Sequence, residues 1–160
     1  MIPATFADGI KLIKNIRTED REEVEASGSS LLFVPFGVLL SEEAYAFHDK
    51  YGNLAGIVGI VRQSPDIGAI WLLSTPAIED INLSVLRVFK RWIETKGEDY
   101  KLLWNLADAR NTKHHKLLRF FKFKAIRSIS AGPNHQPFYE IVKLLFMFIE
   151  NMVLIILCIS

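Results

Sequence analysis

The spacing of hydrophobic and polar residues in the first half of the chain predicts two helices followed by a β-hairpin. Residues 4–16 carry apolar side chains at approximately helical spacing, and the acidic stretch 19–26 is followed by a glycine that is typical of a helix end. The apolar run 31–40 is broken by a proline and a glycine, which predicts a packed loop or a short helix rather than a regular strand. Segments 44–48 and 54–61 flank a polar turn that contains glycine, as in a β-hairpin.

After residue 68 the pattern predicts an alternation of strands and helices. The expected strands are 68–74, 101–107, 124–130 and 138–143, and the expected helices run from 83 to a glycine at 97 and from 112 to about 121. Hairpin strands followed by strand–helix–strand units predict an α/β fold of the α+β type, a mixed sheet with helices packed on its faces. We expect one domain over residues 1–143 and a hydrophobic C-terminal appendage over residues 144–160.

Composition limits the compartment and the chemistry. Half of the 160 residues are hydrophobic, and the one cysteine, Cys158, has no partner in the chain for a disulfide. No basic region leads into an apolar run near Met1, so the expected location is cytosolic. The four histidines and the cysteine show no metal-ligand spacing, so no metal site is expected. The adjacent His114 and His115 point in different directions on a helix, and we interpret them as surface or hydrogen-bonded histidines.

Charge is distributed unevenly along the chain. Residues 1–50 have a net charge of −4, whereas residues 87–127 have a net charge of +8. The favoured interpretation is that these bases cover the outer faces of two helices, and an anionic partner such as nucleic acid is the alternative. The basic helix also carries Phe120, Phe121 and Phe123, a pattern found in single-strand binding, although the last two suit the core better.

The segment from Asn111 to Phe123 (NTKHHKLLRFFKF) resembles the corresponding helix of the GNAT superfamily of N-acetyltransferases. Members of that superfamily begin this helix with an asparagine and follow it with an aromatic residue, and both fall at the matching spacing here. Asparagine is a good helix N-cap, and the aromatic residue anchors the helix to the sheet. The resemblance implies a GNAT-like, acyl-CoA N-acyltransferase fold.

A narrower resemblance covers roughly residues 30–143. The segments WLLST (71–75), LWNLADARN (103–111) and GP…PFYE (132–140) are similar to the internal virion protein A family of short-tailed autographiviruses. That resemblance implies a phage protein that acts in virion assembly and contacts phage structural or assembly proteins. It also implies a location in the host cytoplasm during infection, with association with the virion left open.

Two departures from the superfamily pattern bear on acetyl-CoA binding. The superfamily binds the CoA pyrophosphate on a glycine-rich loop, but here the connection 74–84 has no glycine and contains Pro76, Glu79 and Asp80. Leu118 stands where many members have a tyrosine general acid. We therefore expect no cofactor and no conventional acetyl transfer, with a divergent N-acetyltransferase as the alternative. If acyl-CoA is bound, the resemblance assigns it to Trp71, Leu72, Leu73, Ser74, Asn105 and Asn111.

Asp108 and Arg110, at the end of a central strand, are expected to form an ion pair in a structural role. Segment 144–160 is apolar except for Glu150, Asn151 and Ser160, at the lower length limit for a membrane span. A packed or associating helix is the first interpretation of this segment, and membrane contact is the second.

Overall fold

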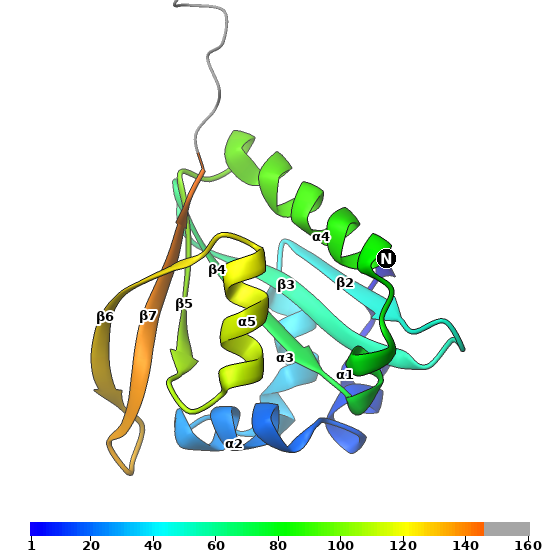
Figure 1. Cartoon of the computed structure of the whole chain (residues 1–160), viewed down its shortest axis with the longest axis horizontal. Helices are drawn as coiled ribbons and strands as arrows, with labels where there is room; N and C mark the ends of the chain where they lie inside the picture. Colours follow the sequence, from blue (N-terminus) through cyan, green and yellow to red (C-terminus); the bar gives the residue numbers. More distant parts are fainter. Residues whose placement is uncertain (146–160) are drawn as a thin grey trace, which may run out of the picture.

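A seven-stranded mixed sheet forms the centre of the protein, and the computed structural model describes residues 1–145 (Figure 1). In spatial order the strands are β1 (Ile2–Pro3), β2 (Glu43–His48), β3 (Leu54–Ser64), β4 (Ile67–Ser74), β5 (Leu102–Asp108), β7 (Gln136–Leu144) and β6 (Lys124–Ala131). Only β4 and β5 are parallel; every other pair of neighbours is antiparallel.

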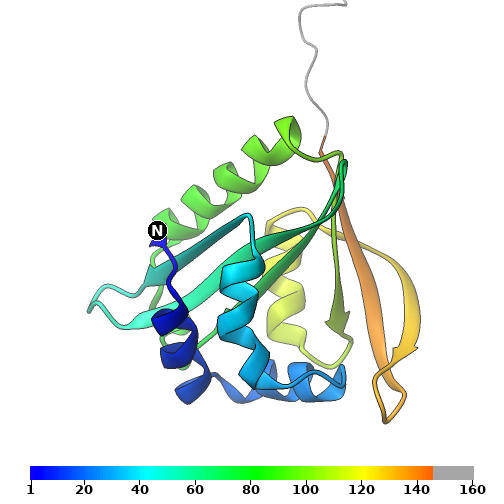
Figure 2. The same ribbon diagram turned by 180° about the vertical axis from the view of Figure 1, so that it is seen from behind.

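Within the described part of the chain, five α-helices surround the sheet. They are α1 (Phe6–Lys14), α2 (Thr18–Ala26), α3 (Val34–Leu40), α4 (Leu83–Thr95) and α5 (Thr112–Phe120), with 3₁₀ turns at Leu31–Phe33, Pro76–Asp80 and Lys96–Glu98. Helices α4 and α5 lie on one face of the sheet (Figure 1), and α1 and α3 lie on the other (Figure 2). Helix α2 runs along the end of the sheet where β4 and β5 finish.

Each face of the sheet has its own hydrophobic core. Under α4 and α5 the core includes Val58, Phe89, Leu103 and Phe121. The smaller core, under α1 and α3, contains Leu12 and Ile57. The two faces follow the alternation of side chains along each strand, so that Val58 and its neighbour Ile57 enter opposite cores. The result is a helix–sheet–helix sandwich.

The predicted fold class is confirmed, with differences at the edges. Segment 31–40 forms a 3₁₀ turn and the short helix α3, with Pro35 in its first turn, where a missing N–H costs nothing. The two-residue strand β1 was not predicted, because two residues carry no periodic signal. Strand β7 extends to Leu144, one residue past the predicted end of that strand, and Leu145 is buried. The division into a domain and an appendage stays a prediction. The remainder of the predicted appendage lies outside the described residues.

Strands β4 and β5 separate soon after they pair. Their parallel ladder contains three residue pairs, from Ile67 opposite Leu102 to Ala69 opposite Trp104. Beyond this point the side chain of Asn105 bridges the gap, because its Nδ2 donates to the carbonyl oxygen of Ile70 at 2.7 Å. The divergence opens a wedge in the middle of the sheet, and this wedge positions the candidate site.

Candidate functional site

A cleft of about 490 Å³ occupies the wedge between β4 and β5. Residues of α3 line it on one side of the sheet, and His114, in the first turn of α5, lines it on the other. Its aromatic lining comes from Trp71, Trp104, Phe33 and Phe138, and its polar lining includes Glu23, Asn105 and His114. The volume lies within the range of roughly 300–1,000 Å³ that is usual for small-molecule sites.

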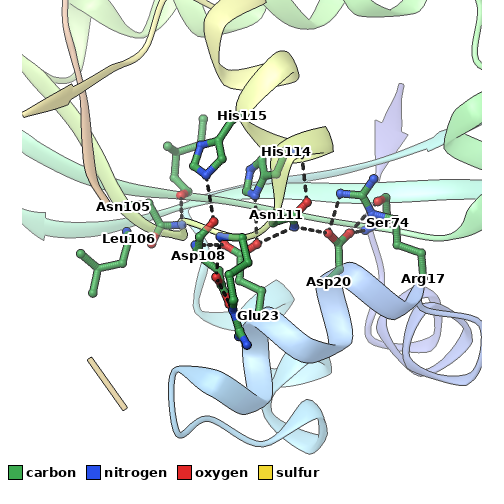
Figure 3. Close-up of polar contacts among 12 residues, drawn as sticks. Arg17, Asp20, Glu23, Ser74, Asn105, Leu106, Asp108, Asn111, His114 and His115 are labelled. Atoms are coloured by element: carbon green, nitrogen blue, oxygen red, sulfur yellow. Dashed lines mark hydrogen bonds and ion pairs between the residues drawn. The ribbon is translucent and has the colours of Figure 1, made fainter. Parts of the chain in front are cut away.

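Asp20 of α2 closes the end of β4 (Figure 3). Its carboxylate is buried and accepts hydrogen bonds from the backbone N–H of Ser74 at 2.8 Å and from the Ser74 hydroxyl at 2.6 Å. The guanidinium of Arg17 pairs with the other oxygen at 2.7 Å, and the Arg17 N–H donates to the Ser74 carbonyl. The last residue of β4 is therefore bound to α2 through both of its backbone polar groups.

Glu23, one helical turn further along α2, performs the same role for β5 and α5. It accepts from the backbone N–H of Asp108 at 3.2 Å and from Asn111 Nδ2 at 2.7 Å, and it contacts His114 Nδ1 at 3.2 Å. Asn111 in turn caps α5, because its Oδ1 accepts from the N–H of His114. Figure 3 shows these contacts meeting between α2 and α5. We call Arg17, Asp20, Glu23, Ser74, Asp108, Asn111 and His114 the carboxylate cluster.

Several backbone N–H groups of the loop after β4 are already hydrogen-bonded within the protein. In segment 74–84 the amides that donate within the chain are those of Ser74, Thr75, Ala77, Ile78, Ile81 and Ser84. Thr75 donates to Ala55, and the others donate to Asp20 or to acceptors within the loop. Pro76 has no N–H, so these seven positions offer no free donor to a pyrophosphate.

Apolar side chains fill the space between this loop and the cleft. The two cavities under α4 and α5 measure about 30 and 10 Å³, no more than room for a few water molecules. Ile78 and Ile81 of the loop and Leu117 of α5 line the smaller one, and Leu118 lines the larger one. Leu118, at the position of the expected tyrosine, is a buried core residue without a proton to transfer.

The six residues assigned to acyl-CoA divide into two groups. Trp71, Leu72, Leu73 and Asn105 line the cleft, whereas Ser74 and Asn111 are buried in the carboxylate cluster. Whether any of them contacts acyl-CoA stays a prediction. Arg17, the N-cap residue of α2, and the α2 residues Asp20 and Glu23 were missed by the sequence reasoning. The spacing of Asp20 and Glu23 could have indicated a shared site, since side chains three residues apart lie on one face of a helix.

The predicted ion pair between Asp108 and Arg110 is confirmed by a two-pronged contact of the guanidinium with the buried carboxylate. Burial acts to raise the pKa of Asp108, but the hydrogen bonds from Arg110 outweigh it and hold that pKa below its ordinary value.

The two adjacent histidines point to different neighbours, as expected. His114 faces Glu23, and His115 Nε2 lies 2.8 Å from the carbonyl oxygen of Asp108.

Within residues 1–145 no group of three or more histidine, cysteine, aspartate or glutamate side chains is arranged to hold a metal ion. Over the same residues no single helix is long and apolar enough to cross a membrane. The bent pair Thr18–Ala26 and Leu31–Leu40 meets that test by length and composition only.

Comparison with solved structures gives the class of fold: it is the GNAT acetyltransferase fold. A ribosomal-protein α-N-acetyltransferase (RimL) in complex with coenzyme A superimposes with a TM-score of 0.65 at 10% identity, covering 90% of this chain and 92% of that chain. A GNAT-family acetyltransferase from Streptococcus pneumoniae gives 0.62 at 17% identity, covering 89% and 96%. A chimeric spermidine N-acetyltransferase from Vibrio cholerae gives 0.63 at 14% identity, covering 89% and 92%.

Sequence comparison adds no closer relative. No protein-family model matches the chain, and no curated protein matches it in sequence. At these identities the structural likeness establishes the fold alone.

Proposed function

We propose that this chain uses a GNAT-like fold as a scaffold for protein contacts in phage virion assembly, without conventional acetyl transfer. The observation that carries the loss of acetyl transfer is that six amides of segment 74–84, beginning with Ser74 bound to Asp20, donate within the chain and that Pro76 has no N–H. A pyrophosphate at this loop would have to displace a buried carboxylate and would meet Glu79 and Asp80. The phage assignment rests on the sequence resemblance over residues 30–143.

An exposed apolar surface supports a role in protein contact. The side chains of Leu32, Phe33, Phe36, Leu39 and Leu40 on the 3₁₀ turn and α3 are each at least 51% exposed. Contiguous apolar surface of this kind is characteristic of interaction sites. The partner in this proposal is a phage structural or assembly protein, met in the host cytoplasm during infection, with the virion as the later location.

Isothermal titration with acetyl-CoA and with free CoA tests the loss of cofactor binding. We expect no heat of binding at micromolar ligand, and a micromolar dissociation constant for either would overturn the proposal. The assembly role is tested in an infection with the phage copy of the gene deleted. Plasmid-borne wild-type chain should restore the yield of infectious particles, and a Leu39→Asp, Leu40→Asp variant should not. Unchanged particle yield after deletion would contradict the assembly role.

A divergent acyltransferase is the second candidate, and the cleft favours it. His114 reaches a cleft of about 490 Å³, and Glu23 fixes its ring orientation from the Nδ1 side. A positioned imidazole next to a small-molecule cleft suits proton transfer from an acceptor amine. Under this candidate, thiol release from acetyl-CoA with a panel of amines is abolished by His114→Gln. The control His135→Asn, in the turn between β6 and β7, leaves it intact. Absence of thiol release from the wild-type chain would dismiss the candidate.

A further inference from the structure

Seven basic side chains on α4, on α5, in the turn after α5 and at the start of β6 make no ion pair with any acid among the described residues. They are Arg87, Lys90, Arg91, Lys116, Arg119, Lys122 and Lys124. Elsewhere the bases are frequently paired, as with Arg62 and Glu42 or Lys101 and Asp66. From Ala109 to Phe138 the chain contains no aspartate or glutamate at all. The local potential of this surface is therefore positive and not neutralised by neighbours.

A groove of about 620 Å³ lies within this basic region, between α5 and the β6–β7 hairpin. Figure 1 shows α5 beside the hairpin, with its other flank toward α4. Thr112, His115 and Arg119 line the groove from α5, Lys124 lines it from β6, and Tyr139 lines it from β7. No acidic side chain lines it. It lies on the opposite flank of α5 from the cleft, which His114 reaches.

The floor of the groove offers aromatic rings in fixed orientations. The rings of His115 and Tyr139 meet edge to face with centroids 5.3 Å apart. His115 is held by its Nε2 contact with the Asp108 carbonyl oxygen, and Tyr139 is half-buried in a paired strand. On the other flank of α5, Phe120 is 38% exposed and the ammonium of Lys90 lies 5.7 Å from the centre of its ring. The described residues therefore combine unpaired cations with two half-buried rings on one flank of α5 and the exposed ring of Phe120 on the other.

We propose that this groove binds single-stranded nucleic acid, with a base against Tyr139 and His115 and the adjoining phosphates on Arg119 and Lys124. Positively charged grooves with aromatic platforms bind single strands because the rings stack with unpaired bases and the cations neutralise the backbone. A duplex keeps the faces of its bases stacked inside, so it offers no unpaired base to stack with these rings. The proposal is separate from the assembly role and from any chemistry in the cleft.

Fluorescence anisotropy with a labelled oligothymidylate at several salt concentrations tests the charged contacts. The double variant Arg119→Ala, Lys124→Ala should bind about tenfold more weakly, and its log–log salt slope should be shallower by about 1.4, or about 0.7 per lost phosphate contact. The matched control Lys14→Ala, Lys50→Ala removes the same charge from two exposed positions outside the groove. It should bind like the wild type, and equal losses in the two double variants would overturn the site.

Two further measurements test the base. Tyr139→Leu keeps apolar volume and removes the ring, and it should weaken binding by about tenfold with the salt slope unchanged. Circular dichroism melting establishes that the variant is folded. A duplex of the same sequence, or free thymidine monophosphate at equal nucleotide concentration, should compete poorly. Equal competition by either one, or no binding of oligothymidylate by the wild-type chain, would overturn the proposal.

Discussion

The carboxylate cluster and the basic groove lie at opposite extremes in how the protein uses charge. In the cluster, Asp20 and Glu23 are buried or nearly so, and each contacts at least three polar groups from other elements or from its own helix. In the groove, Arg119 and Lys124 are exposed and have no acidic partner among the described residues. Both regions contact α5, one at its first turn and the other along its flank.

The difference separates charges that hold the fold from charges that are available to a ligand. A buried carboxylate with its hydrogen bonds satisfied is costly to disturb, because removing it leaves donors and a cation without partners. An exposed, unpaired cation contributes little to stability and keeps its full electrostatic reach toward an anion.

Replacing Asp20 with alanine should lower the free energy of unfolding by about 3–5 kcal/mol, because it strands the buried Arg17 guanidinium and the Ser74 amide. Urea denaturation measures the change. The control Glu25→Ala removes an exposed carboxylate from the same helix and should cost less than about 0.5 kcal/mol. Similar losses of unfolding free energy in both variants would show that the buried carboxylate of Asp20 stabilises the fold no more than an exposed one does.

Replacing Asn111 with alanine should cost about 1–2 kcal/mol, the upper part of the range for an N-cap, because its amide group also donates to Glu23. Asn82, which caps α4 through its contact with the Ser84 N–H, is the matched comparison. Asn82→Ala should cost about 0.5–1 kcal/mol in the same urea experiment. If the two variants lose the same free energy of unfolding, the hydrogen bond from Asn111 to Glu23 of α2 adds nothing to stability.

The pKa of Asp108 lies below its ordinary value in the folded protein, so its contribution to stability is present above the unfolded value near pH 4. The contribution is lost as the pH falls through the lower folded value. Asp108→Asn should therefore cost on the order of 1 kcal/mol at neutral pH, and the difference from wild type should shrink in acid. Urea unfolding at several pH values measures it, with the exposed Asp66→Asn as control. A difference that stays constant with pH would contradict the assignment.

The double variant Arg119→Ala, Lys124→Ala should change the free energy of unfolding by less than about 0.5 kcal/mol, since within residues 1–145 neither side chain has a charged partner to lose. Thermal and urea unfolding give this value beside the anisotropy measurement. A loss comparable to that of Asn111→Ala would mean that these cations belong to the fold and would erase the contrast between the two regions.

Local patterns were enough to predict most of the fold. The hairpin at 44–61, the alternation after residue 68 and the Asn111 cap all depend on neighbours in sequence, and each was recovered with small boundary errors. Phe121 and Phe123 are buried as expected, at 3% and 7% exposure. The 31–40 segment was ambiguous because Pro35 permits either a loop or the first turn of a helix.

The site was less accessible to sequence reasoning because its contacts are long-range. Asp20 bonds to Ser74, 54 positions away, and Glu23 bonds to Asp108, 85 positions away. A short acidic helix is usually solvated, and nothing in its spacing names its partners. The unusual composition of the 74–84 loop could be recognised in the sequence, but the use of six of its N–H groups within the chain required the structure. The groove also depends on a helix and a hairpin meeting in space.

The three-pair ladder between β4 and β5 has a consequence for how the chain assembles. On one side of this seam, β1 to β4 are all joined by antiparallel pairing, and on the other side β6 and β7 form a local hairpin against β5. In each half, strands that follow one another in the sequence pair directly, as β2–β3, β3–β4 and β6–β7 do. Contacts between segments close in sequence favour rapid folding. Helix α2 belongs to the first half but bonds to the ends of both central strands. We expect these bonds to form last, and amide hydrogens beside the seam to exchange before those of the outer ladders.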